Sequence, residues 1–241
     1  MCLSFTHLEW DTAFFGFNVA RITQTDSDGA DLTNILRFLR DKNYRLAYWC
    51  IPAETAESSL IAQKHGAFLA DEKVTYAKVL AGISDSLESS TYTATPYPGT
   101  MADLALINLA IQSSEFSRFR LDPLVPRELC DKLYTSWIER SVSKEIAWET
   151  LVVKEQNDLL GLITLGTKDG RGDIGLVAVA EHERGKGIGK ALVTAADKHF
   201  SERGYTLAQV VTQRCNLGAC RLYESCGYQI ENIENVFHFW L

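Results

Sequence analysis

The residues best suited to chemistry lie in a short glycine-rich turn, Arg184-Gly-Lys-Gly-Ile-Gly189, followed by Lys190. Glycine lets the backbone turn tightly and approach a ligand closely. The turn follows a predicted strand and opens a predicted helix, whose first N–H groups have no partner within the helix and form an anion site. Because Arg184, Lys186 and Lys190 add positive charge, the turn is a predicted cradle for a pyrophosphate. The alternative is a solvated loop.

Two other phosphate-binding patterns are excluded by the spacing. The pattern G-x-x-x-x-G-K-[ST] fails because Lys190 is followed by Ala191. A dinucleotide fingerprint fails because the glycines read G-x-G-x-G and follow strands of the antiparallel type.

The elements that must position this turn are predicted from turn residues and apolar periodicity. Polar turns separate three strands before it, and Gly204 and Gly227 end the two helices after it. The predicted elements are strands at 148–156, 159–167 and 173–180, a helix from Gly189, a strand at 206–212, a helix at 217–226, and a strand or strand pair at 228–241.

The N-terminal part is also predicted to be α/β, with a linker near residue 90. It contains helices at 31–42 and 55–65, a strand at 45–51, extended chain at 68–80, and a Ser/Thr/Pro-rich stretch at 84–100. Between 101 and 141 we expect two helices flanking a loop at 116–123. The expected division is therefore an N-terminal α/β subdomain at 1–90 and a second domain at 91–241.

A faint internal repeat relates the two parts. One constant shift along the sequence, without gaps, matches Tyr44 to Tyr205, Leu46 to Leu207, Ala47 to Ala208 and Gly66 to Gly227. Both segments read strand, helix, glycine, strand, which either common ancestry or shared α/β construction explains. The shift places Thr55 on Asn216 and Ala62 on Tyr223, so only the C-terminal copy carries these reactive residues.

The segment Val177-Ala178-Val179, with Arg184 to Gly189, resembles the acetyl-CoA-binding motif R-x-x-G-x-G of GNAT acetyltransferases. Asn216, Ala219, Leu222-Tyr223 and Gly227-Tyr228 resemble that family's next motif, N-x-x-A-x-x-L-Y-x-x-x-G-[FY]. Glu181 departs from the pattern, since members often have proline there. The resemblance implies the GNAT fold, an α/β (α+β) class with a mixed, mostly antiparallel sheet flanked by helices.

The resemblance also implies acetyl-CoA as co-substrate, without a metal. The backbone of Val177 and Val179 would pair with the pantetheine arm, and Asn216 would contact that arm. The implied cofactor-binding residues are Val177, Ala178, Val179, Arg184, Gly185, Lys186, Gly187, Ile188, Gly189, Lys190 and Asn216.

Acetyl transfer to an amine needs a polarised carbonyl and a proton for the leaving thiolate. The Val179 N–H is predicted to polarise the carbonyl. Tyr223 is the predicted general acid, since a phenol is a donor with a pKa of about 10; the alternative is a core aromatic. The general base stays open among a water relay and four carboxylates: Glu9, Asp11, Glu115 and Asp122.

The acceptor is suggested by a second resemblance. Residues 8–16 (LEWDTAFFG) with 19–22, and 117–120 (SRFR) with Tyr134-x-x-Trp137-Ile138, are similar to TDP-fucosamine acetyltransferases. The resemblance implies a TDP-4-amino-4,6-dideoxy-hexose as acceptor, in surface-polysaccharide synthesis. The expected substrate-binding residues are Trp10, Phe15, Ser117, Arg118, Phe119 and Arg120.

Arginine forks suit the oxygens of a diphosphate, and aromatic rings suit a base or sugar. The alternative is that these arginines are surface groups and that the aromatics pack the first strand.

Composition narrows the classes of function. A net charge of −7 argues against nucleic-acid binding. The N-terminal residues lack the pattern of a secretory signal, and apolar runs are far shorter than the about 20 residues that cross a bilayer. Six cysteines without C-x-x-C spacing suggest reduced thiols, no metal site and a cytoplasmic location. Alternative functions are acetylation of another small amine or a peptide N-terminus, and a non-catalytic CoA-binding scaffold. The oligomeric state stays open, a homodimer included.

Overall fold

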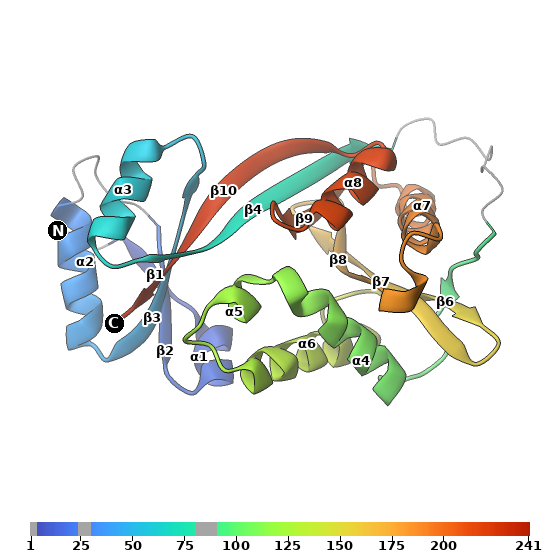
Figure 1. The fold of residues 1–241 in the computed structure, drawn as a ribbon, viewed down its shortest axis with the longest axis horizontal. Coiled ribbons are helices and arrows are strands. Elements are labelled where there is room, and N and C mark those ends of the chain that lie inside the picture. The colour runs from blue at the N-terminus through green and yellow to red at the C-terminus, as the bar shows by residue number, and fades with distance from the viewer. Residues whose placement is uncertain (1–3, 24–29, 81–90) are drawn as a thin grey trace. The chain divides into compact units, whose positions relative to one another are not determined.

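The computed structural model describes residues 4–23, 30–80 and 91–241 (Figure 1). These residues form two compact units. The N-terminal unit consists of residues 1–73 with 232–241, and the C-terminal unit of residues 74–231. Strands β4 (Phe68–Val79) and β10 (Gln229–Trp240) each contribute residues to both units. Each unit is described by itself.

The N-terminal unit contains one part of the sheet, covered by helices. Its strands lie in the order β1 (Phe5–His7), β2 (Asn18–Ile22), β3 (Tyr44–Pro52), β10. The pair β2/β3 is parallel, whereas β1/β2 and β3/β10 are antiparallel. Its helices are α1 (Glu9–Phe15), α2 (Ala30–Asp41) and α3 (Ala56–Lys64).

One face of this sheet forms an apolar core with α2 and α3. Alternate residues of β3 and β10 point to the same face, where they meet the apolar stripe of α2. This core includes Leu32, Ile35, Leu36, Leu39, Ala47, Trp49, Ile51, Ala62, Phe237 and Phe239.

The C-terminal unit contains the larger part of the sheet. Its strands lie in the order β4, β9 (Leu207–Gln213), β8 (Arg171–Val179), β7 (Asp158–Lys168), β6 (Glu149–Glu155), β5 (Thr95–Pro96). The pair β8/β9 is parallel, and the pairs from β8 to β5 are antiparallel. Its helices are α4 (Leu104–Gln112), η1 (Ser113–Phe116), α5 (Arg118–Leu121), α6 (Arg127–Val142), η2 (Glu181–Glu183), α7 (Ile188–Glu202) and α8 (Leu217–Ser225).

Helices cover both faces of this sheet. On one face, α4 and α6 pack an apolar cluster that includes Leu106, Ile138 and Leu162. On the other face, α7 packs so closely that a Cβ added at Gly172 would lie 2.4 Å from the Phe200 ring. The predicted class, a mixed and mostly antiparallel sheet flanked by helices, is confirmed.

Most predicted elements are confirmed, and one differs in detail. The predicted loop at 116–123 contains α5, because Ser117 caps a helical turn by accepting from the Arg120 N–H. Helix α1, around Trp10, was not among the predicted elements. The segment 228–241, predicted as a strand or a strand pair, forms one long strand, β10.

The predicted domain boundary falls between residues 90 and 91. Residues 81–90, which include the start of the predicted linker, lie outside the described residues, and β5 pairs with β6 shortly after them. The two compact units divide elsewhere, within β4 and β10. The boundary at 90 therefore stays a prediction.

The internal repeat is visible in the element bounds. The shift that takes Tyr44 to Tyr205 also places α3 on α8 and β4 on β10, so that their first residues coincide and their last residues coincide. Gly66 and Gly227, which follow the two helices, have left-handed φ values of 78° and 84°. The partners of the repeated strands are exchanged, however: β4 lies beside β9, and β10 pairs with β3.

Candidate active site

Strands β8 and β9 pair at one end and separate at the other. Parallel pairing joins Gly172–Ile174 to Ala208–Val210. Strand β8 continues to Val179 and β9 to Gln213, and this stretch, which is fully described, contains no further β8/β9 pair. The C-terminal halves of the two strands therefore border an opening in the sheet.

A β-bulge explains why β8 turns away. The register of β7 and β8 shifts, since Ile163 faces Val177 whereas Leu165 faces Ile174. Two residues of β8 thus oppose Thr164, whose Oγ1 accepts a hydrogen bond from the Leu176 N–H at 2.8 Å. A bulge bends its strand and increases the local twist. A Cβ at Gly175 would lie 2.8 Å from the Thr164 hydroxyl, so glycine leaves room for this contact.

The exposed backbone of β8 faces the opening. The Ala180 N–H donates to the Leu160 carbonyl at 2.9 Å, and the Leu176 N–H also points toward β7. Because N–H groups alternate along a strand, those of Val177 and Val179 point the other way. This direction suits a strand-like ligand laid between β8 and β9.

The glycine-rich turn lies next along the chain. Gly185 and Gly187 adopt φ values of 81° and 93°, a region that side chains other than glycine rarely adopt. The first backbone bond of α7 runs from the Ala191 N–H to the Gly187 carbonyl. The N–H groups of residues 188–190 therefore precede the helical ladder, where the helix dipole favours an anion.

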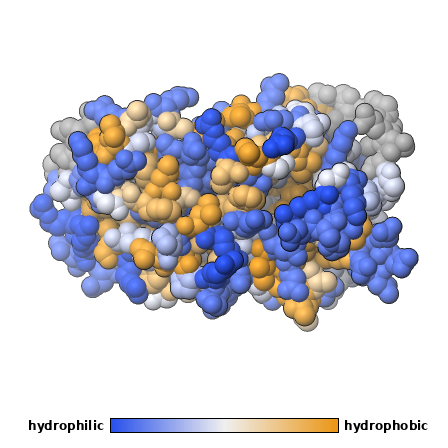
Figure 2. Space-filling model, in the orientation of Figure 1, coloured by the Kyte–Doolittle hydropathy of each residue, from blue (hydrophilic) through white to orange (hydrophobic). Residues whose placement is uncertain are grey.

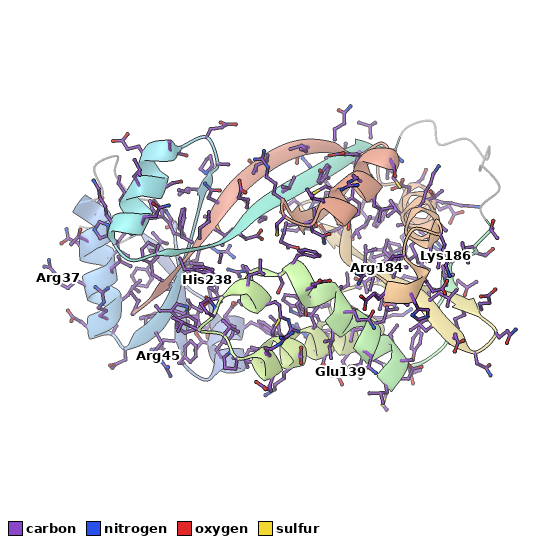
Figure 3. All side chains as sticks on the ribbon, viewed as in Figure 1. Arg37, Arg45, Glu139, Arg184, Lys186 and His238 are labelled. Carbon is purple, nitrogen blue, oxygen red and sulfur yellow. The ribbon has the colours of Figure 1, made fainter. Side chains whose placement is uncertain are left out.

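Two of the predicted cations at this turn have acidic neighbours. Lys186 Nζ donates to Glu183 Oε1 at 2.9 Å, and this hydrogen bond raises the lysine pKa. Arg184 Nε donates to the Val179 carbonyl at 3.2 Å, and its Nη1 lies 3.8 Å from Glu115 Oε2. Figure 3 shows both cationic side chains beside the start of α7, and Figure 2 shows hydrophilic residues gathered on this segment.

Helix α8 brings the second motif to the same end of α7. A Cβ at Gly189 would lie 3.0 Å from the Leu222 side chain, so the two helices pack closely there. Asn216 caps α8, because its Oδ1 accepts from the Ala219 N–H at 3.1 Å. The predicted contact of Asn216 with the cofactor arm remains a prediction.

Tyr223, on α8, is 4% exposed. Burial raises the pKa of its phenol, which keeps the group protonated over the physiological range. Its hydroxyl forms no hydrogen bond with any residue in the described part of the chain. The group is therefore chemically suited to donate a proton to a bound ligand.

The predicted acceptor residues of the N-terminal unit lie on α1, of which no residue is buried. The Trp10 ring stacks on that of Phe14, with centroids 5.2 Å apart and planes inclined by 10°. Phe15 stacks in turn on Phe17 at 5.6 Å. Asp11, one candidate base, accepts a hydrogen bond from the Tyr48 hydroxyl at 3.3 Å.

The residues of the C-terminal unit that were predicted to bind the acceptor substrate have different contacts in the structure. Ser117 is a helix cap and Phe119 is buried, so both stabilise the local fold. Arg120 donates to Asp131 and, at 2.7 Å, to Ser114 Oγ, and only 12% of its side chain is exposed. Arg118 lies with its guanidinium carbon 4.4 Å from the centre of the Phe119 ring. The guanidinium of Arg120 is thus engaged within the protein.

Several residues of this region were not predicted from the sequence. Glu183 and Tyr76 were not singled out, and Thr164 was read only as part of a strand. A glycine inside a strand, such as Gly175, is a usual sign of a bulge and was available as a signal. Nothing in the sequence near Tyr223 indicates Tyr76, which comes from a distant strand.

The described residues offer little for other kinds of site. Within residues 4–23, 30–80 and 91–241, no group of three His, Cys, Asp or Glu side chains is arranged to hold a metal ion. No helix in that part of the chain is both long and apolar enough to cross a membrane.

Comparison with known proteins points to one family. Residues 118–228 match the family model described as Acetyltransferase (GNAT) family. The crystal structure of a GCN5-related N-acetyltransferase from Sphaerobacter thermophilus aligns with a TM-score of 0.65 and 17% identity, covering 98% of this chain and 75% of that one. At this identity the likeness concerns the fold.

Two curated relatives match over shorter stretches. The spore coat polysaccharide biosynthesis protein SpsD of Bacillus subtilis is 26% identical over 145 residues, which is 60% of this chain and 49% of SpsD. The mycothiol acetyltransferase of Thermobispora bispora is 39% identical over 57 residues, 24% of this chain and 19% of that protein. The chain thus spans about half or less of these relatives. Residues 118–228, which include the turn before α7 and the separated part of the β8/β9 pair, thus match the GNAT family of acetyltransferases, and the fold of the chain is similar to that of a GCN5-related N-acetyltransferase.

Proposed function

We propose that this protein transfers an acetyl group from acetyl-CoA to the nitrogen of an amine. The observation that carries the proposal is the opening between β8 and β9, which is bordered by outward-facing N–H groups and continues into the turn before α7. In the proposal the pantetheine arm lies along Val177 to Val179. The pyrophosphate binds the N–H groups of residues 185–190.

The proposed reaction is a direct transfer. The neutral amine attacks the thioester carbonyl, whose oxygen accepts a hydrogen bond from the Val179 N–H as negative charge develops on it. The carbon–sulfur bond then breaks, and Tyr223 donates its proton to the leaving thiolate. The attacking nitrogen loses one proton to solvent, and the Tyr223 phenolate takes one proton from solvent, which regenerates the acid.

No side chain is assigned as the base. Glu115 lies beside Arg184, and Asp122 is 1% exposed and accepts from the Leu124 N–H. Asp11 accepts from Tyr48, and Glu9 lies at the exposed start of α1, 3.9 Å from His7 Nε2. A water relay to solvent therefore fits the described contacts best.

The proposed acceptor is a nucleotide-activated amino sugar of the TDP-4-amino-4,6-dideoxy-hexose type. The likeness to SpsD, a protein named for polysaccharide biosynthesis, supports a sugar acceptor. Arg118, rather than Arg120, is the arginine proposed to contact the diphosphate, because Arg120 is paired with Asp131. A second candidate is another small amine, which the likeness to mycothiol acetyltransferase favours. A cytoplasmic location and a homodimer stay expectations.

The test follows thiol release from acetyl-CoA with a panel of TDP-amino sugars, simple amines and peptides. Turnover with a TDP-amino sugar, inhibited competitively by TDP, is the expected result. Turnover with simple amines or peptide N-termini alone would replace the acceptor and keep the acetyltransferase. Acetyl-CoA binding without turnover on any acceptor would favour a non-catalytic CoA-binding scaffold, and absence of binding would overturn the proposal.

A further inference from the structure

The ring of Tyr223 lies close to the rings of two other tyrosines. The Tyr76 ring, on β4, lies 5.8 Å from that of Tyr223, and the Tyr228 ring lies 6.1 Å away. Each of these neighbours is fixed by a carboxylate, since the Tyr76 hydroxyl donates to Glu224 Oε1 at 2.9 Å and the Tyr228 hydroxyl to Asp197 Oδ1 at 2.6 Å. The two neighbours therefore direct their hydroxyl protons elsewhere, and neither donates to Tyr223.

A partly buried ion pair extends this arrangement. Lys78 Nζ donates to Asp197 Oδ2 at 2.6 Å and to the Cys226 carbonyl at 2.7 Å. Asp197 lies on α7 and is 3% exposed, and Cys226 ends α8. The pair thus links β4, α7 and the end of the helix that carries Tyr223.

The N-terminal unit shows whether this arrangement of strands and helices requires polar groups at these positions. The shift that relates the two copies places Lys78 on Phe239, Asp197 on Leu36 and Tyr228 on Ala67. It also places Tyr76 on Phe237 and Tyr223 on Ala62. All of these counterparts are apolar and belong to or pack against one core cluster.

In the N-terminal copy, the same order of strand, helix, glycine and strand therefore forms with apolar residues at all of these positions. Exchanging a buried ion pair for well-packed apolar residues is often neutral or stabilising, because two charges no longer lose their hydration. The need for a stable fold does not account for Lys78, Asp197 and Tyr228. What distinguishes the C-terminal copy is that it carries Tyr223.

We infer that Tyr76, Tyr228, Asp197 and Lys78 are positioning residues that hold the Tyr223 phenol toward the leaving sulfur. The inference rests on the proposed acetyl transfer. The two carboxylate-bound tyrosines pack against the Tyr223 ring, and the ion pair holds the end of α8. Loss of one hydroxyl lets the ring move, and a shift of about 1 Å in a reacting group costs up to about a hundredfold in rate.

The test is a double-mutant cycle on kcat, with Tyr228→Phe and Tyr223→Phe alone and combined. Tyr228→Phe should lower kcat by about tenfold to a hundredfold and leave KM for acetyl-CoA unchanged. In the Tyr223→Phe background the same change should have almost no further effect, because its partner in the reaction is already absent. Tyr205→Phe, which removes a hydroxyl bonded to Thr167 in the same unit, should match the wild type.

A second variant transplants the apolar set, Lys78→Phe with Asp197→Leu and Tyr228→Ala. It should keep acetyl-CoA affinity and lose kcat; if it does not fold, the double-mutant cycle decides. Equal losses from Tyr228→Phe in both backgrounds, or no loss in either, would overturn the positioning role. A wild-type protein without thiol release would instead overturn the proposed acetyl transfer, so the two failures are distinct.

Discussion

The two units share a plan of parallel strands and helices but differ where a ligand would enter. In the N-terminal unit, β2 and β3 pair along the whole of β2, from Asn18 with Tyr44 to Ile22 with Trp49. In the C-terminal unit, β8 and β9 pair over three positions and then separate. The bulge opposite Thr164 belongs to the C-terminal unit, whereas the β2 register shifts only at its first residue.

The segments that enter the central helices also differ in charge. The turn before α7 carries Arg184 and, between two glycines, Lys186, whereas the sequence before α2 contains Asp26 and Asp28. The latter residues lie outside the described ones, so the comparison is of composition alone. Acidic residues repel a phosphate where basic ones attract it. In the proposed function, a strand bulge and the residues of one turn are therefore what would make the C-terminal copy a binding site.

The largest effect is expected from a side chain introduced into the glycine-rich turn, because this would remove the predicted anion site that distinguishes the C-terminal unit. Gly187→Glu should abolish acetyl-CoA binding, because φ at this position is 93° and the new carboxylate would face the pyrophosphate. Isothermal calorimetry measures the affinity. Gly204→Glu is the matched control, since Gly204 has a φ of 85° at the far end of α7 and should retain binding. Unchanged affinity in a folded Gly187→Glu protein would reject the site.

Tyr223 distinguishes the two copies chemically, because its counterpart is Ala62. Tyr223→Phe should lower kcat by about 10²–10⁴-fold, the usual contribution of a general acid. Acetyl-CoA affinity should stay nearly intact, since the phenol acts on the leaving sulfur and not on the phosphates. Wild-type kcat, measured where the chemical step limits the rate, would remove Tyr223 from the mechanism.

A smaller effect is expected at Arg118. A hydrogen bond to a charged group is worth about 1.5–3 kcal/mol, so Arg118→Ala should raise the acceptor KM by about tenfold or more, at about 1.4 kcal/mol per decade. Acetyl-CoA affinity should not change. Arg120→Ala is the contrasting variant: it should lower the melting temperature, because Asp131 and Ser114 lose their partner. An unchanged KM in Arg118→Ala would move the acceptor away from this helix.

The smallest expected effect is on how the free energy of unfolding depends on pH, and it is expected at Asp197. The equivalent residue of the N-terminal copy is Leu36. Burial raises the pKa of the Asp197 carboxyl above its ordinary value of 3.8, although Lys78 and Tyr228 lower it. The folded state then holds the proton more tightly than the unfolded state. The free energy of unfolding should therefore fall as pH rises above about 4, until the carboxyl is ionised in both states.

Urea unfolding at a series of pH values above about 4 measures this slope. Asp197→Asn should flatten it, and Asp158→Asn, at the exposed start of β7, should not. A slope that is the same in the wild type and Asp197→Asn would contradict the direction of the shift.

Sequence patterns predicted the local elements well for identifiable reasons. The strands between 148 and 180 are joined by polar turns, and Gly204 and Gly227 follow their helices in the left-handed conformation. The glycine turn was recognisable because its function depends on residues adjacent in sequence. These signals are local, and the structure places them where the pattern predicted.

The contacts that could not be predicted from the sequence join residues that lie far apart along the chain. The approach of Tyr76 to Tyr223 and the pairing of Arg120 with Asp131 depend on which elements become neighbours. The bulge at Thr164 depends on the register between two strands, which a single strand does not record. The aromatic run at Trp10 reads as strand by composition, yet it forms one short helix.

The exchange of strands between the two repeats has a consequence for how the chain acquires its structure. The N-terminal unit contains the first strand, β1, but its sheet is completed by residues 232–241 of β10. During synthesis, β3 is complete at Pro52, whereas the antiparallel neighbour that pairs with it begins only at Gln229. Contacts so distant in sequence slow folding, and an unpaired edge invites pairing with other chains in the meantime. A ribosome-bound fragment that ends at Glu231 should accordingly expose the edge of β3 and be the species most prone to aggregate.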